Sequence, residues 1–348
     1  HITYVTPLED FGTAGAVKAA AKHLDERFMI ISGDLLTDFD LSKAIAFHEK
    51  KQAKATITLT AVTDPLQFGV VITDKESRIT KFLEKPGWGE VFSDTINTGI
   101  YILEPEVLEL IPEGENRDWA KDVFPKMLEN ADDLFGCDLQ GYWADIGNPE
   151  AYLEACQDIC HGRVTVKVHE PARSTEERIF ISPDAQVDEQ ARLSGMVVLG
   201  GNTWIKGNAS LTNCVVGRNC QIEEGVTLED AILWDNVYIK AGTRITGSNL
   251  GHRVRVGKNS VIESGVVIAD ETMIGDNVNI RPNVKIWPRK VIESGSTVST
   301  NLIWGEKWRK SLFEGALVRG MTNVELTPEF SARLGAAYGS TLPKDSFI

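Results

Sequence analysis

The sequence has few basic residues, no closely paired cysteines and no long apolar run. Its 348 residues include 36 lysines and arginines against 50 aspartates and glutamates, which gives a formal net charge of −14. Binding to nucleic acid depends on a basic face that contacts phosphates, so we expect no nucleic-acid partner. No apolar run approaches the roughly 18 residues of a membrane-spanning helix. We therefore expect no membrane partner either.

The five cysteines form no CxxC pair and show no zinc-ligand spacing. This pattern predicts a reduced, cytoplasmic protein rather than a disulfide framework. Cys156, Cys160 and His161 fall on one expected helix and suggest a ligand cluster, but packing in a core is the commoner role of such cysteines. With 42% hydrophobic and 25% charged residues, the composition is that of an ordinary globular protein of about two domains.

Short β-branched segments alternate with helix-like segments over residues 1–162. The expected strands cover residues 28–31, 55–62, 69–73, 79–83, 100–103 and 142–146. The expected helices cover residues 13–24, 42–51 and 149–161. Asn148 and Pro149 are strong signals for the start of the last helix, and Gly162 is a natural stop. The alternation predicts an α/β domain with a mostly parallel sheet.

From residue 181 onward an aliphatic residue recurs every six positions, with three slips of one residue. The last series is unbroken over nine positions, from Leu250 to Val298. A period of six fits neither a helix nor simple strand alternation and is typical of a parallel β-helix, with Gly and Asn at the corners. Trp204, Trp234 and Trp287 suggest a contact patch on it, with ordinary packing as the alternative.

Three charged residues lie where expected strands end. Asp34 follows the buried strand 28–31 and Asp145 closes another, and two carboxylates that converge at the crevice of a parallel sheet suit a Mg²⁺ ion bound chiefly by phosphates. The alternative is that each aspartate only caps a nearby helix. Lys85, with a carboxylate beside it, suits a phosphate or a sugar hydroxyl, unless it is only a solvated hairpin charge.

Seven segments together are far more specific than any one residue. They are residues 11–15 (FGTAG), 32–38 (SGDLLTD), 68–71 (FGVV), 82–86 (FLEKP), 96–101 (INTGIY), 121–125 (KDVFP) and 143–147 (WADIG). In this order the chain resembles the sugar-1-phosphate nucleotidyltransferases, and among these most the mannose-1-phosphate guanylyltransferases. The resemblance covers residues 1–305 and implies a Rossmann-like α/β catalytic domain followed by a left-handed β-helix of hexapeptide repeats.

The resemblance also implies roles for ten residues. Gly12, Thr13 and Gly15 would lie against the base and ribose; Asp34 and Asp145 would hold Mg²⁺; Gly69, Glu84, Asn97 and Thr98 would line the sugar; and Lys85 would contact the sugar phosphate. The implied reaction is attack by the phosphate of mannose 1-phosphate on the α-phosphorus of GTP, which yields GDP-mannose and pyrophosphate. Such a reaction needs positioning and charge neutralisation rather than a protein nucleophile.

The chain departs from the family at both ends. The family begins with a Gly-rich loop that carries Arg and Lys and cradles the triphosphate. No such loop precedes Phe11, so we expect a piece of a longer protein, which by itself binds nucleotide weakly. Residues 312–335 resemble the opening of a phosphohexomutase domain. That family has a Gly-Thr stretch where Glu314 and its neighbours stand here, and we expect no mutase activity of this chain.

Four segments are predicted: an incomplete nucleotidyltransferase domain (1–162), a linker (163–178), the left-handed β-helix (179–305) and the start of a phosphohexomutase-like domain (306–348). By resemblance we expect a homo-oligomer built through the β-helix. Three other functions stay open. They are a glucose-1-phosphate adenylyl- or uridylyltransferase, a non-catalytic regulatory homologue that binds sugar nucleotide, and an acyltransferase that uses His252, the one histidine of the repeats. Retention of Asp34, Lys85 and Asp145 argues against the regulatory reading.

Overall fold

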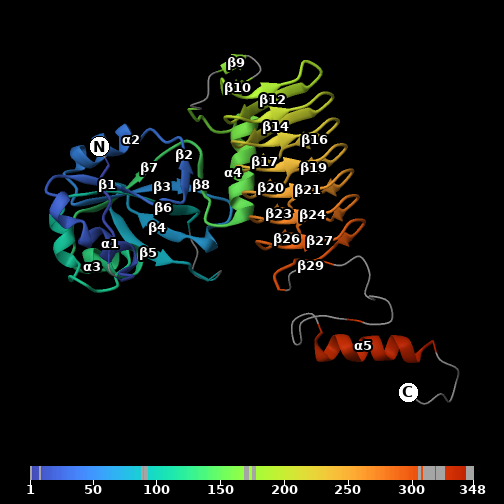
Figure 1. The fold of residues 1–348 in the computed structure, drawn as a ribbon. Helices are drawn as coiled ribbons and strands as arrows, with labels where there is room; N and C mark the ends of the chain where they lie inside the picture. Colours follow the sequence, from blue (N-terminus) through green and yellow to red (C-terminus); the bar gives the residue numbers. More distant parts are fainter. Residues whose placement is uncertain are drawn as a thin grey trace. The chain divides into compact units, whose positions relative to one another are not determined.

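The computed structural model describes residues 2–7, 9–87, 89, 93–167, 172–174, 178–304, 307–308, 318 and 326–341 (Figure 1). The chain divides into two compact units, His1–Gly147 and Asn148–Ile348. Each unit has its own hydrophobic core. No helix of the described residues is long and apolar enough to cross a membrane.

The first unit is built on one mixed sheet. Its strands are β1 (Phe28–Ile31), β3 (Ala55–Ala61), β4 (Gly69–Thr73), β5 (Ile79–Glu84), β6 (Thr95–Leu103) and β7 (Leu134–Asp138). They are arranged in the order β5-β4-β6-β3-β7, and β1 also pairs with β6. The sequence predicted all of these strands except β7, and of β6 it predicted only the second half.

The sheet corrects the expectation of mostly parallel pairing. β1, β3 and β4 all run antiparallel to β6, and β7 runs parallel to β3. β1, β3, β4 and β7 therefore run in one direction, as the alternation with helices predicted. β6 lies among them and runs in the opposite direction. Among the described strands of this sheet, only β3 and β7 form a parallel pair. β5 returns against β4 through a tight turn in which the Ser77 amide donates to the Asp74 carbonyl over 3.0 Å.

Helical segments cover both faces of the sheet. They are α1 (Gly12–Ala19), η1 (Ala21–His23), α2 (Leu41–Lys51), η2 (Pro65–Gln67), η3 (Pro105–Leu110), the π-helical turn η4 (Trp119–Val123) and α3 (Phe124–Glu129). Because side chains alternate along a strand, Tyr101 and Leu103 of β6 pack with η3, η4 and α3, whereas Ile100 and Ile102 join the core that includes α2. The Asp40 side chain caps α2 by accepting from the Ser42 amide; the sequence offered either of these two residues as the cap.

β6 changes its neighbour along its length, and this change opens the sheet. Its first half pairs with β4 at Ile96, and its second half pairs with β1 from Ile100 onward. Between these positions β4 and β1 diverge. A separate two-stranded antiparallel ribbon, β2 (Leu35–Thr37) with β8 (Trp143–Asp145), follows β1 in the chain. We call the gap between β4 and β1 the fork of the sheet. The fork and the ribbon determine where a ligand can enter.

The second unit is a parallel β-helix with three faces. One face contains β11 (Gln186–Val187), β13 (Trp204–Ile205), β15 (Gln221–Ile222), β18 (Tyr238–Ile239), β21 (Arg255–Val256), β24 (Met273–Ile274), β27 (Val291–Ile292) and β29 (Lys307–Trp308). The other two faces share β10 (Ile179–Ile181), β12 (Arg192–Leu199), β14 (Ser210–Val216), β16 (Thr227–Glu229), β17 (Ile232–Leu233), β19 (Arg244–Thr246), β20 (Asn249–Leu250), β22 (Val261–Ile262), β23 (Val267–Ile268), β25 (Asn279–Ile280), β26 (Lys285–Ile286) and β28 (Thr297–Val298). β9 (Ala172–Ser174) pairs antiparallel with β10.

The six-residue period becomes a column of buried side chains. All nine positions from Leu250 to Val298 are at most 5% exposed, which confirms the predicted core. The register also explains the three slips. Successive strands of the first face are 17 residues apart in the three turns from Trp204 to Arg255, and 18 residues apart before Trp204 and from Arg255 to Val291. Asparagines such as Asn219 and Asn259 adopt positive φ at the corners, as expected for a residue that tolerates the left-handed region.

Helix α4 (Pro149–His161) belongs to the second unit and lies along its strands (Figure 1). Asn148 caps it by accepting from the Ala151 amide, and Gly162 ends it in the left-handed conformation, as the sequence predicted. Arg178 donates to the carbonyl oxygens of Ile159 and Cys160 at its C-terminal end. The predicted domain boundary at residue 162 stays a prediction. A further helix, α5 (Pro328–Gly339), follows the stack in the chain.

The side chains singled out in this unit have structural surroundings. Cys160 is 2% exposed, and the described residues contain no group of three or more potential ligands arranged for a metal. Trp204 lies on the face that begins at β11, whereas Trp234 and Trp287 follow β17 and β26. All three side chains are exposed, and the contact patch stays a prediction. His252 packs edge-on against Trp234 at 4.8 Å.

Candidate active site

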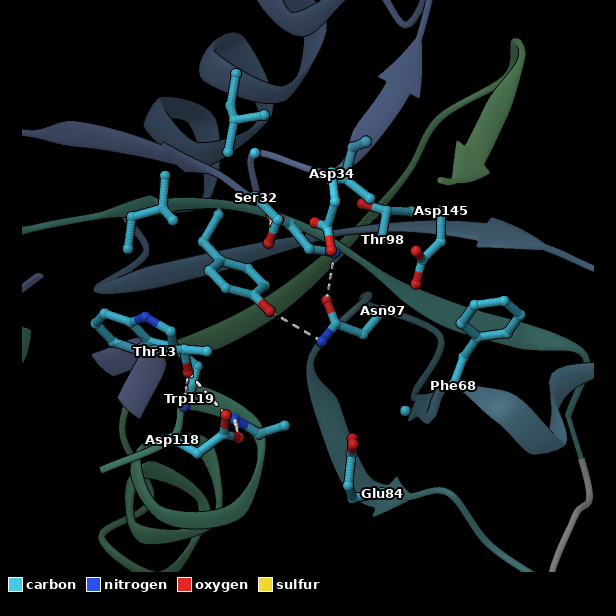
Figure 2. Close-up of a pocket in the computed structure, with 18 of the residues that line it drawn as sticks. Thr13, Ser32, Asp34, Phe68, Glu84, Asn97, Thr98, Asp118, Trp119 and Asp145 are labelled. Carbon is cyan, nitrogen blue, oxygen red and sulfur yellow. Dashed lines mark hydrogen bonds between the residues drawn. The ribbon is translucent and has the colours of Figure 1, made fainter. Parts of the chain in front are cut away.

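A cavity of about 600 Å³ lies at the fork of the sheet in the first unit. It is lined by Thr13, Val17, Ile30, Ile31, Ser32, Gly33, Asp34, Leu35, Gln67, Phe68, Gly69, Glu84, Lys85, Asn97, Thr98, Gly99, Tyr101, Asp118, Trp119, Ala120, Trp143 and Asp145. Eight of the ten residues that the resemblance singled out are in this set; Gly12 and Gly15 are not. Figure 2 labels six of these eight residues around the cavity: Thr13, Asp34, Glu84, Asn97, Thr98 and Asp145. Its size is that of ordinary small-molecule sites.

The two aspartates meet through the ribbon rather than through parallel strand ends. Leu35, the residue after Asp34, is paired with Asp145 across β2 and β8, and the Ile146 amide donates to the Asp34 carbonyl over 2.9 Å. The expected crevice of parallel strands is therefore wrong as the cause, because β8 runs antiparallel to β2. The expected juxtaposition of the two residues is nevertheless present (Figure 2).

Both carboxylates border the same small space. A Cβ atom built on Gly147 would lie 3.0 Å from Asp145 Oδ1 and 3.6 Å from Asp34 Oδ2. Both aspartates are exposed, so their oxygens are accessible. Two carboxylates beside an open space fit a hard cation such as Mg²⁺, which takes one or two protein carboxylates and completes its shell with water and substrate phosphates. The described residues offer no larger ligand cluster.

The opposite wall presents a polar side chain held in one orientation. Asn97 donates from Nδ2 to the Tyr101 hydroxyl over 3.0 Å and accepts at Oδ1 from the Gly99 amide over 3.0 Å (Figure 2). Burial raises the pKa of Tyr101 to about 12, so its hydroxyl stays protonated at neutral pH. Gly99 has φ +76°, and a Cβ there would meet the Ser32 hydroxyl oxygen at 3.0 Å. Backbone and side chain together fix the amide of Asn97 at the fork.

Glu84 and Lys85 lie at the end of β5. Burial, and then the charge of Asp118, raise the pKa of Glu84, while the Lys85 ammonium opposes that shift. The Lys85 amide donates to the Phe68 carbonyl over 3.2 Å, and the residue has φ +46°. A Cβ on Gly69 would come within 2.9 Å of Glu84 Oε2, so a glycine there leaves room for the carboxylate.

The N-terminal residues of α1 divide into two groups. Thr13 lines the cavity, donates to Asp118 Oδ2 over 2.8 Å and accepts from the Trp119 amide over 3.2 Å. Gly12 and Gly15 pack on a neighbouring loop instead, where a Cβ on either would lie 2.6 Å from the carbonyl oxygen of Arg117 or of Glu115. Their predicted contact with a base stays a prediction, and the loop supplies a packing reason for both glycines.

Two family models match the chain. "Nucleotidyl transferase" matches residues 1–162, and "EIF2B subunit epsilon LbH domain" matches residues 176–280. The UTP–glucose-1-phosphate uridylyltransferase of Synechocystis sp. is 30% identical over 74% of this chain and 66% of its own length. The mannose-1-phosphate guanylyltransferase of Mycobacterium tuberculosis is 31% identical over 70% of this chain and 62% of its own length.

The mannose-1-phosphate guanyltransferase of Yarrowia lipolytica is 30% identical over 87% of this chain and 80% of its own length. The chain belongs to the sugar-1-phosphate nucleotidyltransferase family. It spans less than two thirds of the length of the Synechocystis and Mycobacterium relatives. The match to an LbH domain agrees with the β-helix that the repeats predicted and with the left-handed form that the resemblance implied.

Several residues in the wall of this cavity were not predicted from the sequence. They are Asp118, Trp119, Tyr101, Phe68 and Trp143. Tyr101, Phe68 and Trp143 stand inside the segments that carried the resemblance, so a closer reading of those segments offered a signal. Asp118 caps η4 by accepting from the amides of Ala120 and Lys121, three residues before the segment 121–125.

Thr98 turns its side chain away from the cavity. Its hydroxyl donates to the Thr58 carbonyl over 3.0 Å, and the residue is 1% exposed. Its own carbonyl accepts from Trp143 Nε1 over 2.9 Å, and the Trp143 ring meets Phe68 edge-on at 5.3 Å. Thr98 therefore supports the wall through its backbone, and the aromatic pair closes that side.

Proposed function

We propose that this protein transfers a nucleotidyl group from a nucleoside triphosphate to a sugar 1-phosphate, with GTP and mannose 1-phosphate as its substrates. The observation that carries the proposal is the meeting of Asp34 and Asp145 beside one open space, in a cavity whose other walls present Glu84, Lys85 and Asn97. A phosphate oxygen of the sugar 1-phosphate forms a bond to the α-phosphorus. The bond from that phosphorus to the bridging oxygen breaks, and pyrophosphate leaves.

The residues of the cavity have distinct tasks in this reaction. Lys85 pairs with the phosphate of the sugar, a task that suits a compact ammonium charge. Glu84 accepts a hydrogen bond from a sugar hydroxyl, and Asn97, held by Tyr101 and the Gly99 amide, presents a fixed partner to another. Fixed donors and acceptors stabilise a charged transition state because they need not reorganise during the reaction.

Mg²⁺ is the proposed cofactor, and Asp34 and Asp145 would hold it. When bound, the ion neutralises phosphate charge and favours departure of pyrophosphate. Of the charged side chains that line the cavity, Asp34, Glu84, Asp118 and Asp145 are acidic and Lys85 is basic. An anionic nucleotide therefore meets excess negative charge on these walls unless a cation accompanies it. This charge balance supports a divalent cofactor.

The test is a panel of nucleoside triphosphates and sugar 1-phosphates on the protein as its gene encodes it, with release of pyrophosphate as the measurement. GTP with mannose 1-phosphate is expected to give the highest kcat/KM. A strong preference for ATP or UTP with glucose 1-phosphate would replace the substrates but keep the reaction. No turnover with any pair, together with binding of a sugar nucleotide, would favour a regulatory homologue.

A second candidate is uridylyl transfer to glucose 1-phosphate. It is favoured by the Synechocystis relative, which carries that name at 30% identity. Both reactions use the same carboxylate pair and differ in the contacts to base and sugar. The same panel separates them, because a discriminating hydrogen bond changes kcat/KM by orders of magnitude between matched and unmatched substrates.

The proposal includes an assembly and a location. It comprises a homo-oligomer built through the β-helix and a cytoplasmic site of action, and the five free cysteines accord with a reducing compartment. Light scattering combined with size-exclusion chromatography tests the assembly. A monomer at micromolar concentration would contradict it.

A further inference from the structure

Gly147 lies against both carboxylates of the proposed cation site, and it closes the segment 143–147 without having been assigned a role. It follows Asp145 by two residues and is the last residue of the first unit. Its amide donates to Asp145 Oδ1 over 2.9 Å. A hydrogen bond to one oxygen of a carboxylate fixes the orientation of the group and leaves the second oxygen for another partner.

The missing side chain of Gly147 is as important as its amide. A Cβ atom there would lie 3.0 Å from Asp145 Oδ1 and 3.6 Å from Asp34 Oδ2, which is the space that the two carboxylates border. A methyl group would displace the Asp145 carboxylate by a few tenths of an ångström and occupy room that a cation and its water need. Mg²⁺ demands near-ideal geometry, with oxygens about 2.1 Å from the ion, so small displacements matter.

Backbone conformation does not require a glycine at this position. The φ angle of Gly147 is not in the positive range, and the residue is exposed. The usual reason for a glycine, freedom in the left-handed region, therefore does not apply. The backbone is also tied just before it, because the Ile146 amide donates to the Asp34 carbonyl. An added methyl group thus acts mainly on the carboxylates.

We propose that Gly147 is a positioning residue of the cation site: its amide orients Asp145, and its bare Cα keeps the space between Asp145 and Asp34 open. The inference rests on the proposed function, since it concerns the cation that the reaction uses. It predicts that metal affinity depends on a residue that contributes no side-chain ligand.

The chain supplies a matched control. Gly33 directly precedes Asp34, as Gly147 closely follows Asp145, and it also lacks a positive φ. Its two chain neighbours aside, no atom of the described residues lies within 4 Å of the place where its Cβ would stand. Gly147→Ala and Gly33→Ala therefore make the same chemical change beside the two carboxylates, but only the first intrudes on the space between them.

The experiment measures Mn²⁺ binding to the protein by electron paramagnetic resonance, without turnover, for both alanine variants and for Asp145→Asn. Gly147→Ala is expected to weaken Mn²⁺ binding by about 10-fold or more, the usual effect of disturbing a group that orients a ligand. Gly33→Ala is expected to stay within about twofold of the unchanged protein. Kinetics as a function of Mg²⁺ should show a raised half-saturating concentration for Gly147→Ala.

The outcomes separate the inference from the function beneath it. If Asp145→Asn weakens Mn²⁺ binding and Gly147→Ala does not, the positioning role is wrong and the cation site stands. Equal losses in Gly147→Ala and Gly33→Ala would also overturn it, because the space between the carboxylates would then not be the cause. If Asp145→Asn leaves Mn²⁺ binding unchanged, the cation site itself is misassigned. Thermal unfolding of each variant verifies that the fold is retained.

Discussion

The two units of this chain obtain their stability in different ways, and the difference shows where chemistry can take place. In the β-helix each turn repeats the pattern of the one before it, and a continuous column of buried aliphatic residues forms the interior. In the first unit β6 changes neighbours partway along its length, and the divergence of β4 and β1 leaves a cavity. Regular stacking buries every turn alike, whereas an interruption in pairing creates room for a ligand.

The largest expected effect tests this division at the ribbon. Asp145→Asn removes a negative charge from the pair with Asp34, and we expect kcat/KM for nucleotidyl transfer to fall by at least about 100-fold, as when one group that stabilises a charged transition state is lost. Pyrophosphate release by the protein as its gene encodes it is the measurement. Unchanged turnover would show that the cavity is not the catalytic site and would favour a regulatory role.

A substitution in the core of the β-helix should lower the stability of the protein but leave its catalysis nearly unchanged. Ile262 is 1% exposed and lies in register between Ile245 and Ile280 of neighbouring turns. Ile262→Ala should lower the free energy of unfolding by about 2–5 kcal/mol, because a large side chain leaves a cavity in a tightly packed core. Thermal unfolding of the second unit measures the loss. At temperatures where the variant stays folded, kcat should change little. A large fall in kcat at these temperatures would contradict the division between a stabilising β-helix and a catalytic first unit.

The same contrast explains what the sequence could reveal. The six-residue period recurs many times along the β-helix, so the buried column from Leu250 to Val298 could be predicted from the pattern alone. Even the three slips have a cause in the register, since they match the three turns of 17 residues that lie between turns of 18. Because the period is repeated, one atypical residue does not conceal it.

The first unit contains no such repeat, and the pairing of its strands could not be predicted from the sequence. The apolar run 28–31 indicated a buried strand, but nothing in it shows that β1 lies beside the second half of β6 while β4 lies beside the first. That arrangement depends on contacts between residues far apart in the chain. Asp34 and Asp145 were found because both follow strands, yet the ribbon that joins them was not foreseen. Thr98 lines the cavity as expected, but the sequence did not show that its hydroxyl bonds within the sheet, and its contact with a sugar stays a prediction.

A smaller effect tests the cavity by its charge. Burial raises the pKa of Glu84 above its ordinary value of about 4.3. Glu84 therefore takes up a proton at a higher pH than a free glutamate does, and its capacity to accept a hydrogen bond from a sugar hydroxyl declines as the pH falls through this raised value. The KM for the sugar 1-phosphate should rise on the acid side.

Glu84→Gln should raise that KM about 10-fold at neutral pH, the loss expected for one hydrogen bond to a charged group. It should also flatten the acid limb of log KM against pH, measured at saturating nucleotide. Glu224→Gln is the matched control, because this exposed carboxylate belongs to the stack. A limb that persists unchanged in Glu84→Gln would assign the titration to another group.

The smallest expected effect returns to the corners of the stack. Asn259 adopts φ +52°, where asparagine is tolerated and alanine is strained by about 1 kcal/mol. Asn259→Ala should therefore lower the free energy of unfolding of the stack by about that amount, whereas Asn259→Gly, which accepts the left-handed region freely, should lose less. Thermal unfolding of both variants is the measurement. If glycine loses as much as alanine, the side chain of Asn259 rather than its backbone conformation stabilises the corner. In either case nucleotidyl transfer should be unaffected, because the corner lies in the repeating unit and not at the fork.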